Sequence, residues 1–566
     1  MTATAGAGAV NLAGPITLGA AQTWSNNGGN ALTVSGNVAN AGNTLTLGGS
    51  GAVALTSVVS GAGGLGKSGA GTATLSGANT FSGAVAVNGG TLKAGVASVA
   101  GVSGAFGNGT AVTLANTPGA ALDITGFNTQ IGSLAGGGAS GGNVTLGAAA
   151  LTVAGTGTTT YSGVIAGSGG SLVKTGSGSL TLAGNTSNTY TGGTTLTTGV
   201  LGLAKTGGAY AIPGDFTGNN INSPDVFATT DNQFAPGAVM RFTGTGGDHV
   251  RFELLGTTQT LAGIDNSLSS GYGVIQHKEQ VGTAAVSSLS TLVLNGTGTY
   301  SFNAYLRDTG GRVALSKTGS GTQTLSGTVI DYTGITTLAA GRLNYVDLDD
   351  MHSAGIAMST GTVVEFANTA RSFARFTNTL ISGDGTFIKS GSNLMTTGNS
   401  GGYARWAMTG GTIDVQQGEF RVDYQDQALA WVNNKAAMNV ASGATVSMVG
   451  GNHISVDALT GAGTVQNINN WGTGIFTVGQ NNGSGTFTGI LRDNGGPLAL
   501  NKTGAGTQTL TGPSTYTGGT TVSGGTLLVD FAAGGTSNIL PSSGTLTLGA
   551  EPWSSRAEPA RPIPRS

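Results

Sequence analysis

One motif returns four times along this chain with nearly constant internal spacing, near residues 65–92, 172–201, 315–343 and 500–527. One copy reads Leu172-Val-Lys174-Thr-Gly176, followed by Thr181-Leu182-Ala-Gly184, Tyr190-Thr-Gly192 and Gly199-Val-Leu201. A repeat of this length predicts a stacked architecture in which each unit contacts its neighbours. The recurring residue types, Gly, Thr, Leu and Lys, build strands and turns but are poorly suited to catalysis.

Each copy carries a lysine at its start and an aromatic residue in its second half. The lysines are Lys67, Lys174, Lys317 and Lys502, and the aromatic residues are Phe81, Tyr190, Tyr332 and Tyr516. A fifth, degraded copy near residues 387–420 begins at Phe387-Ile-Lys389-Ser-Gly391. We expect the aromatic residues to form a stack or a corner plug inside the fold. A basic stripe of lysines is conceivable, but we favour lysines that flank turns and discourage lateral association of sheets.

The segments between these landmarks alternate apolar residues with threonine. Thr44-Leu-Thr-Leu47 and Thr545-Leu-Thr-Leu548 are examples of this period of two, which is typical of half-buried strands. The chain contains 105 glycines, which supply the positive φ angles of tight turns between strands. The sequence therefore predicts an all-β fold, a single parallel β-helix (β-solenoid) over residues 1–550. It should be right-handed because parallel crossovers nearly always are.

The composition changes after the last recognisable strand. Residues 551–566 hold four of the chain's 12 prolines, and proline cannot donate to a strand ladder, so the solenoid should stop there. This tail could be a flexible extension, an altered reading frame or a protective cap.

Charge and composition exclude several functions. Only 8% of the residues are charged and the net charge is -2, so no basic surface is expected to bind nucleic acid. There is no cysteine, and stability must come from backbone ladders and packing rather than disulfides. We find no targeting signal at the start and no run of about 18 apolar residues, so no direct membrane insertion by this chain is expected. Either a signal was removed or the chain is an internal fragment.

The motifs resemble the autotransporter-associated β-strand repeat, also called the passenger-associated-transport repeat. The resemblance is carried by residues 172–184, 501–512 and 516–522, and it covers most of residues 40–550. It implies a secreted right-handed β-helix on the surface of a Gram-negative-type bacterium. As a marker of fold the motif is fairly specific, but as a marker of function it is weak.

Candidate catalytic and metal-binding residues are few. A polysaccharide-active β-helix enzyme would need clustered carboxylates, and the best local cluster is Asp347, Asp349 and Asp350, which we interpret as a solvated turn beside the third repeat. No histidine has metal-ligand spacing, and we expect surface positions for His249, His277, His352 and His453. The sequence thus predicts no catalytic residue, no cofactor and no metal site.

Residues 206–290 and 344–440 are richer than the rest of the chain in aromatic residues and arginine. A recognition patch could include Tyr403, Arg405, Trp406, Arg421, Tyr424 and Trp431, since aromatic and arginine residues commonly anchor binding surfaces. We favour the alternative that they fill wider coils inside the solenoid.

The sequence as a whole predicts a non-catalytic extracellular protein, a structural stalk or an adhesin-like autotransporter passenger. One alternative is a self-assembling extracellular fibre, because the open end rungs of a solenoid can pair with another chain. The other is the β-helix enzyme. The expected partners are a second copy stacked end to end, or a surface glycan or protein.

Overall fold

The computed structural model describes residues 1–219, 221–244, 248–266, 272–278, 288–326, 330–373, 375–399, 402–423, 430–431, 433–531 and 538–549. The chain forms two compact units, Met1–Asn344 and Tyr345–Ser566, and each is described by itself. The tail at 551–566 lies outside the described residues. The single continuous solenoid over residues 1–550 stays a prediction.

The named elements of both units are strands, and they form where the sequence alternates apolar residues with threonine. In β11 (Thr72–Leu75), Ala73 and Leu75 are buried while Thr72 and Thr74 are half-buried. β-Branched threonine suits the outer face of a pleated strand because its side chain is stiff and its hydroxyl stays hydrated. The inward apolar residues of successive strands make up the core.

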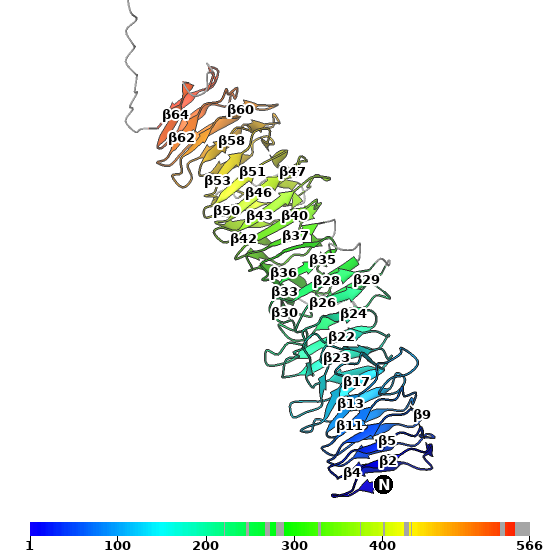
Figure 1. Cartoon of the computed structure of the whole chain (residues 1–566). Helices are drawn as coiled ribbons and strands as arrows, with labels where there is room; N and C mark the ends of the chain where they lie inside the picture. The colour runs from blue at the N-terminus through cyan, green and yellow to red at the C-terminus, as the bar shows by residue number, and fades with distance from the viewer. Residues whose placement is uncertain are drawn as a thin grey trace, which may run out of the picture. The chain divides into compact units, whose positions relative to one another are not determined.

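The described strands of the first unit build three large sheets and several smaller groups (Figure 1). The longest sheet follows the order β1 (Thr2–Ala3), β4 (Gln22–Asn26), β7 (Leu45–Gly48), β10 (Leu65–Lys67), β12 (Val85–Val87), β14 (Ala111–Leu114), β17 (Ser133–Gly136), β20 (Thr158–Tyr161), β23 (Ser179–Gly184), β25 (Val200–Lys205), β27 (Asp225–Ala228), β29 (His249–Glu253), β32 (Tyr272–Gln276), β35 (Tyr305–Arg307), β38 (Ile330–Asp331). The second follows β2 (Val10–Leu12), β5 (Leu32–Val34), β8 (Val53–Leu55), β11, β13 (Thr91–Ala94), β15 (Ala121–Asp123), β18 (Asn143–Thr145), β21 (Ile165–Ala166). The third follows β16 (Thr129–Ile131), β19 (Ala150–Val153), β22 (Ser171–Lys174), β24 (Thr194–Leu196), β26 (Phe216–Asn219), β28 (Val239–Thr243), β31 (Gly263–Asp265).

The smaller groups of the first unit complete its coils. They are β3 (Ile16–Thr17), β6 (Val38–Ala39), β9 (Val59–Ser60); β30 (Thr258–Leu261), β33 (Leu289–Leu294), β36 (Arg312–Lys317), β39 (Thr336–Leu338); and β34 (Thr299–Phe302), β37 (Thr322–Ser326), with β40 (Arg342–Val346) beginning before the division between the units.

The described strands of the second unit stack in the same way. Its longest series is β43 (Val363–Ala367), β46 (Thr386–Ser390), β51 (Thr412–Val415), β53 (Ala437–Val440), β56 (Leu459–Gly461), β59 (Gly485–Phe487), β62 (Thr507–Leu510), β64 (Thr526–Val529). Two further sheets follow the orders β47 (Met395–Thr396), β52 (Glu419–Val422), β54 (Thr445–Met448), β57 (Thr464–Asn467), β60 (Ile490–Asp493), and β55 (His453–Val456), β58 (Gly474–Val478), β61 (Leu498–Lys502), β63 (Thr520–Val522), β65 (Leu546–Leu548). The remaining strands are β42 (Gly355–Met358), β45 (Leu380–Gly383), β50 (Arg405–Met408), β41 (Asp350–Met351), β44 (Arg375–Phe376) and the antiparallel pair β48 (Gly398–Asn399), β49 (Gly402–Tyr403).

Successive strands within the large sheets pair in parallel and in register. Leu45 lies opposite Leu65, which lies opposite Val85, so 20 residues separate one coil from the next here (65 − 45 and 85 − 65). Inward residues therefore face inward residues of the next coil, and apolar rows run along the inside of each unit. This arrangement confirms the predicted parallel β-solenoid.

Buried asparagines tie three successive coils together at the turns. The Asn79 side-chain oxygen accepts the Val59 N–H at 2.7 Å, while its amide nitrogen donates to the Ala105 carbonyl at 2.6 Å. Asn188 makes the same two contacts, with the Ile165 N–H at 3.0 Å and the Ala211 carbonyl at 2.8 Å. These amides replace backbone pairing at positions where the chain turns and no ladder can continue.

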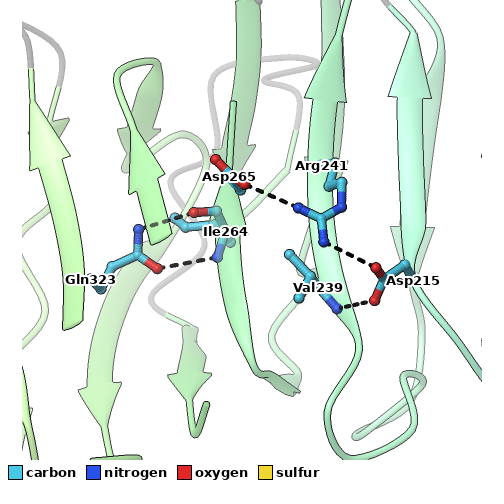
Figure 2. A network of polar contacts seen from close by, with 6 residues as sticks. All are labelled: Asp215, Val239, Arg241, Ile264, Asp265 and Gln323. Carbon is cyan, nitrogen blue, oxygen red and sulfur yellow. Dashed lines mark hydrogen bonds and ion pairs between the residues drawn. The ribbon is translucent and has the colours of Figure 1, made fainter. Parts of the chain in front are cut away.

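Two buried glutamines use their side-chain amides to pair with the backbone N–H and carbonyl of a single residue on another strand. Figure 2 shows Gln323, from β37, donating to the Ile264 carbonyl at 3.0 Å and accepting the Ile264 N–H at 3.2 Å. Ile264 lies on β31, the last strand of its sheet. Gln508, from β62, makes the same pair of bonds to Leu459 on β56, at 2.9 and 3.0 Å. Both glutamines belong to a repeat copy and follow its Lys-Thr-Gly turn.

Replacing Gln508 with leucine should lower the free energy of unfolding by about 1–3 kcal/mol, because the buried N–H and carbonyl of Leu459 lose their partners. Urea denaturation of the purified chain measures the change. The matched control is Gln480→Leu at an exposed position, where we expect a change within about 0.5 kcal/mol. Equal urea midpoints for the two variants would contradict the assigned role of Gln508.

Candidate functional sites

The repeat lysines are buried, although charged side chains are seldom found in cores. Lys67, Lys174, Lys317, Lys502 and the lysine of the degraded copy, Lys389, are at most 2% exposed. Each lies at or near the end of its strand and two residues after an inward apolar residue, such as Leu65 before Lys67 or Leu172 before Lys174. Because strand side chains alternate between faces, the spacing of two directs the lysine inward.

Four of the five ammonium groups are held by backbone carbonyls of two successive turns. Lys67 Nζ donates to the carbonyls of Ser68 and Gly69, both at 2.8 Å, and to Gly89 of the next coil at 3.1 Å. The corresponding acceptors are Thr175, Gly176 and Thr198 for Lys174, Ser390, Gly391 and Gln417 for Lys389, and Thr503, Gly504 and Gly524 for Lys502; Lys317 donates to Gly319. Three acceptors satisfy the three donors of an ammonium group.

The lysine therefore fastens one turn of the solenoid to the next. Burial lowers the pKa of Lys67, Lys174 and Lys389 to about 8. The sequence-based interpretation correctly placed these lysines beside turns. It was wrong in assigning them to discourage sheet association, and the alternative of a basic surface stripe is also wrong, because the side chains point into the fold.

The second glycine of the repeat makes room for this arrangement. Gly199 has a φ of +76°, and a Cβ there would lie 2.3 Å from the Gly176 carbonyl oxygen and 2.9 Å from Lys174 Nζ. Any side chain would thus collide with the ammonium group and with one of its acceptors. The Lys-Thr-Gly and Gly-x-Leu parts of the motif form one structural device, which explains why they recur together.

The repeat aromatic residues are buried and carry a second recurrent contact. The hydroxyl of Tyr190 lies 2.5 Å from the Thr194 hydroxyl, and Tyr332–Thr336 and Tyr516–Thr520 repeat the contact at 2.7 and 2.6 Å. In the first copy Phe81 has no hydroxyl, and the fourth residue after it is the buried Val85. The first copy thus has a phenylalanine and a valine where the other three copies have a tyrosine and a threonine, and this paired difference can be seen in the sequence.

Arginine and aspartate side chains form further links between coils, and one pattern of aspartate contacts occurs twice. Asp308 accepts the Val313 N–H at 2.8 Å and the Thr333 N–H at 3.1 Å, and Asp493 contacts Leu498 and Thr517 in the same way. Elsewhere Arg241 on β28 bridges Asp265 on β31 at 3.0 Å and Asp215, the residue before β26, at 3.1 Å (Figure 2). These charges are occupied by structural contacts.

The carboxylates considered for catalysis are also occupied. Asp347 lies in a bend with a φ of +53° and accepts the backbone N–H groups of Thr369 and Ala370 at 2.7 and 2.8 Å. Burial alone would raise the pKa of Asp347, but these N–H donors outweigh it and hold that pKa below its ordinary value. Asp349 pairs with Arg371 at 3.2 Å, and Asp350 with Arg375 at 3.1 Å. Asp347 and Asp349 lie in a bend beside the third repeat, close to the turn expected there, whereas Asp350 is half-buried on β41.

The histidines do not assemble a site, and one differs from expectation. His277 is buried, not on the surface, with its two ring nitrogens 2.8 and 3.0 Å from the hydroxyls of Ser290 and Ser288. Burial and the nearby Lys278 lower the pKa of His277, while Asp308 opposes that shift. His249, His352 and His453 are half-buried. Within the described ranges, no group of three His, Cys, Asp or Glu residues could hold a metal ion.

The suggested recognition patch is divided between interior and surface. Trp406 and Trp431 are buried, with their rings stacked 4.9 Å apart. Tyr403 is half-buried, Arg405 is exposed, and Arg421 is held by Glu419 at 2.9 Å. Tyr424 lies outside the described residues. The two tryptophans fill a wide coil, so they cannot contribute to a surface.

One surface feature was missed from the sequence: Trp471 is 75% exposed, in the turn between β57 and β58. Its Asn-Asn-Trp-Gly setting, an aromatic residue among turn formers, was a usable signal. The described part of the chain contains no helix that is long and apolar enough to cross a membrane.

Comparison with known proteins agrees with the repeat geometry. The passenger-associated-transport-repeat family matches residues 65–94, 172–203, 315–344 and 500–529, and each of these segments begins just before a buried lysine. The chain is 32% identical over 466 residues to the adhesin BmaC autotransporter of Brucella suis biovar 1 (strain 1330). This similarity covers 80% of the chain but only 12% of that adhesin, so the chain spans a small part of its relative. No solved structure matches.

Replacing Lys174 with methionine should lower the free energy of unfolding by about 2 kcal/mol or more, because the carbonyls of two buried turns lose a charged donor. Methionine keeps most of the apolar volume, so packing is changed little. Urea denaturation measures the loss, and hydrogen exchange should quicken in the turns at residues 175–178 and 197–199.

The control is Lys93→Met, at a partly exposed lysine 3.3 Å from Asp123, where we expect about 1 kcal/mol or less. The pH dependence gives a second readout. The folded pKa of about 8 lies below the unfolded value of about 10.4, so the unfolded chain binds more protons between them. Wild-type stability should therefore gain a contribution from Lys174 as pH rises through this window, and K174M should lack it. Equal slopes for both proteins would contradict this.

Proposed function

We propose that this chain is a non-catalytic passenger segment on a Gram-negative-type cell surface, with an adhesin-like role. The proposal is supported by the four segments that match the passenger-associated-transport repeat and by the similarity in sequence to an autotransporter adhesin. The sequence similarity over 80% of the chain carries the proposal. The engaged carboxylates support a non-catalytic role, since Asp347, Asp349 and Asp350 each bond to the following coil.

The proposed mechanism is mechanical. Each coil is bonded to the next by the parallel ladder and by the lysine, asparagine and glutamine contacts. Such a scaffold keeps its turns in place without disulfides, and the turns are where variable residues can contact a partner.

Displaying the chain on a non-adherent laboratory bacterium, fused to an outer-membrane translocator, should raise adherence to cultured epithelial cells several-fold. Bacteria carrying the translocator alone are the control, and antibody labelling verifies display. Adherence equal to the control, with display verified, would contradict the adhesin role.

A second candidate function is end-to-end self-assembly, which the last described coil favours. Leu528 on β64 and both Leu546 and Leu548 on β65 are at least 40% exposed, as is the nearby Phe531. An exposed apolar strand edge is a template for pairing with another chain.

Self-assembly predicts filaments that lengthen as protein concentration rises, seen by electron microscopy and analytical ultracentrifugation. The double substitution Leu546→Lys and Leu548→Lys should block the lengthening by placing charges on the edge. A single species of constant size at every concentration would exclude assembly and leave the adhesin proposal intact.

A further inference from the structure

Trp471 differs from the other described tryptophans in its exposure. Trp24, Trp406 and Trp431 are at most 5% exposed, whereas three-quarters of Trp471 faces solvent. Packing of the solenoid therefore does not account for this side chain. A large exposed aromatic residue is a common anchor of recognition, because its flat apolar face loses unfavourable contact with water on binding.

A buried side-chain amide bonds the backbone of the turn that carries Trp471. Asn467, fully buried at the end of β57, donates to the Gly472 carbonyl at 3.0 Å and to the Pro497 carbonyl of the next coil at 2.8 Å. The Trp471 N–H donates to the Asn469 side-chain oxygen at 2.9 Å. A turn fixed in this way binds with a smaller loss of conformational entropy than a free loop.

Glycine turns flank Trp471 in both neighbouring coils. A Cβ on Gly450, in the preceding coil, would lie 2.9 Å from the Trp471 Cβ. A Cβ on Gly496, in the following coil, would lie 1.8 Å from the Asn469 carbonyl oxygen. A side chain at Gly450 would therefore collide with Trp471, and one at Gly496 would collide with the backbone of the same turn, so the two neighbouring coils pack closely against this turn and hold it in place.

The remaining side chains at this corner are neutral hydrogen-bonding groups. Asn470, Thr473 and Asn494 are exposed. The Asn494 amide already donates to Gln466 at 3.2 Å, so the side chains of Asn470 and Thr473 supply most of the amide and hydroxyl donors and acceptors. The charged residues of the following turn are engaged: Arg492 donates to Gln466 at 2.9 and 2.7 Å, and Asp493 binds Leu498 and Thr517.

We propose that Trp471 is the stacking platform of a binding site for a neutral glycan. A pyranose ring presents a flat C–H face to an indole and hydroxyls at its edge to amides, which matches this corner. An anionic ligand would need a basic residue directed at it, and the guanidinium of Arg492 is already turned to Gln466, to which it donates two hydrogen bonds. A protein partner would need a larger apolar area than one tryptophan supplies. The inference rests on the proposed adhesin role and names the class of its ligand.

The test is binding of the purified chain to an array of immobilised neutral glycans. Wild type should bind at least one of them, Trp471→Ala should weaken that binding about tenfold or more, and Trp471→Phe should keep most of it. Ile335→Ala, at another exposed apolar residue, controls for general stickiness and should bind as wild type does. Circular dichroism verifies that each variant is folded.

Two results would overturn the inference: wild type binding no neutral glycan on the array, or Trp471→Ala binding as well as wild type. Adherence of bacteria that display the chain distinguishes a failure of this glycan site from a failure of the proposed adhesin role. Adherence that survives both Trp471→Ala and enzymatic removal of cell-surface glycans would assign adhesion to a protein ligand, which retains the adhesin role but removes its dependence on this site. Glycan binding through Trp471 without any cell adherence would do the reverse.

Discussion

The structure depends on satisfying the backbone carbonyls of its turns, not only those of its strands. In a parallel solenoid, each turn stacks on the turn before it, so carbonyls that would face water in an isolated hairpin become buried. An unpaired buried carbonyl costs about 1–3 kcal/mol, and the cost returns at every coil. The ammonium of the repeat lysine answers this need, because in four of the five copies it places three donors among carbonyls of two successive turns, as Lys67 does. Asn79 and Gln508 serve the same need where the ladder is interrupted.

This solution explains the composition of the repeat as a unit. The lysine needs a strand position of inward parity, a glycine just after it to form the turn, and a second glycine in the next coil to avoid its head group. Lysine fits better than arginine would, because its compact head sits among three carbonyls while the flat guanidinium fork suits bidentate carboxylates. The neutral acceptors also let the interior hold a cation without a buried carboxylate, whose own desolvation would be costly.

Much of the fold could be predicted from the sequence, since period-two alternation and glycine-rich turns act locally. The lysines show where local reasoning stops. A lysine read alone belongs on the surface, but two residues after an inward leucine it must point inward unless the strand ends first, and strand ends are poorly defined by sequence. Trp406 and Trp431 posed the opposite problem: their residue type suits either a binding patch or a wide coil, and only the stacking of their rings decides. Trp471 is a single aromatic residue in a turn, outside the segments rich in aromatic residues, so local composition did not distinguish it.

The same constraint indicates where recognition can evolve. Inward positions are committed to packing and to turn carbonyls, and outward strand positions carry threonines and the charges that bridge neighbouring coils. Turn positions are the ones left to vary in sequence. Their side chains can change without weakening the contacts between coils only where other hydrogen bonds already hold the turn backbone. The turn of Trp471 meets that condition because the buried Asn467 holds it from beneath. In a repeat scaffold of this kind, a ligand site should thus be sought at turns whose backbone is bonded by a buried side-chain amide and whose own side chain is exposed to solvent. The most conspicuous clusters of charge in this chain, such as Arg241 with Asp215 and Asp265, are instead part of the scaffold.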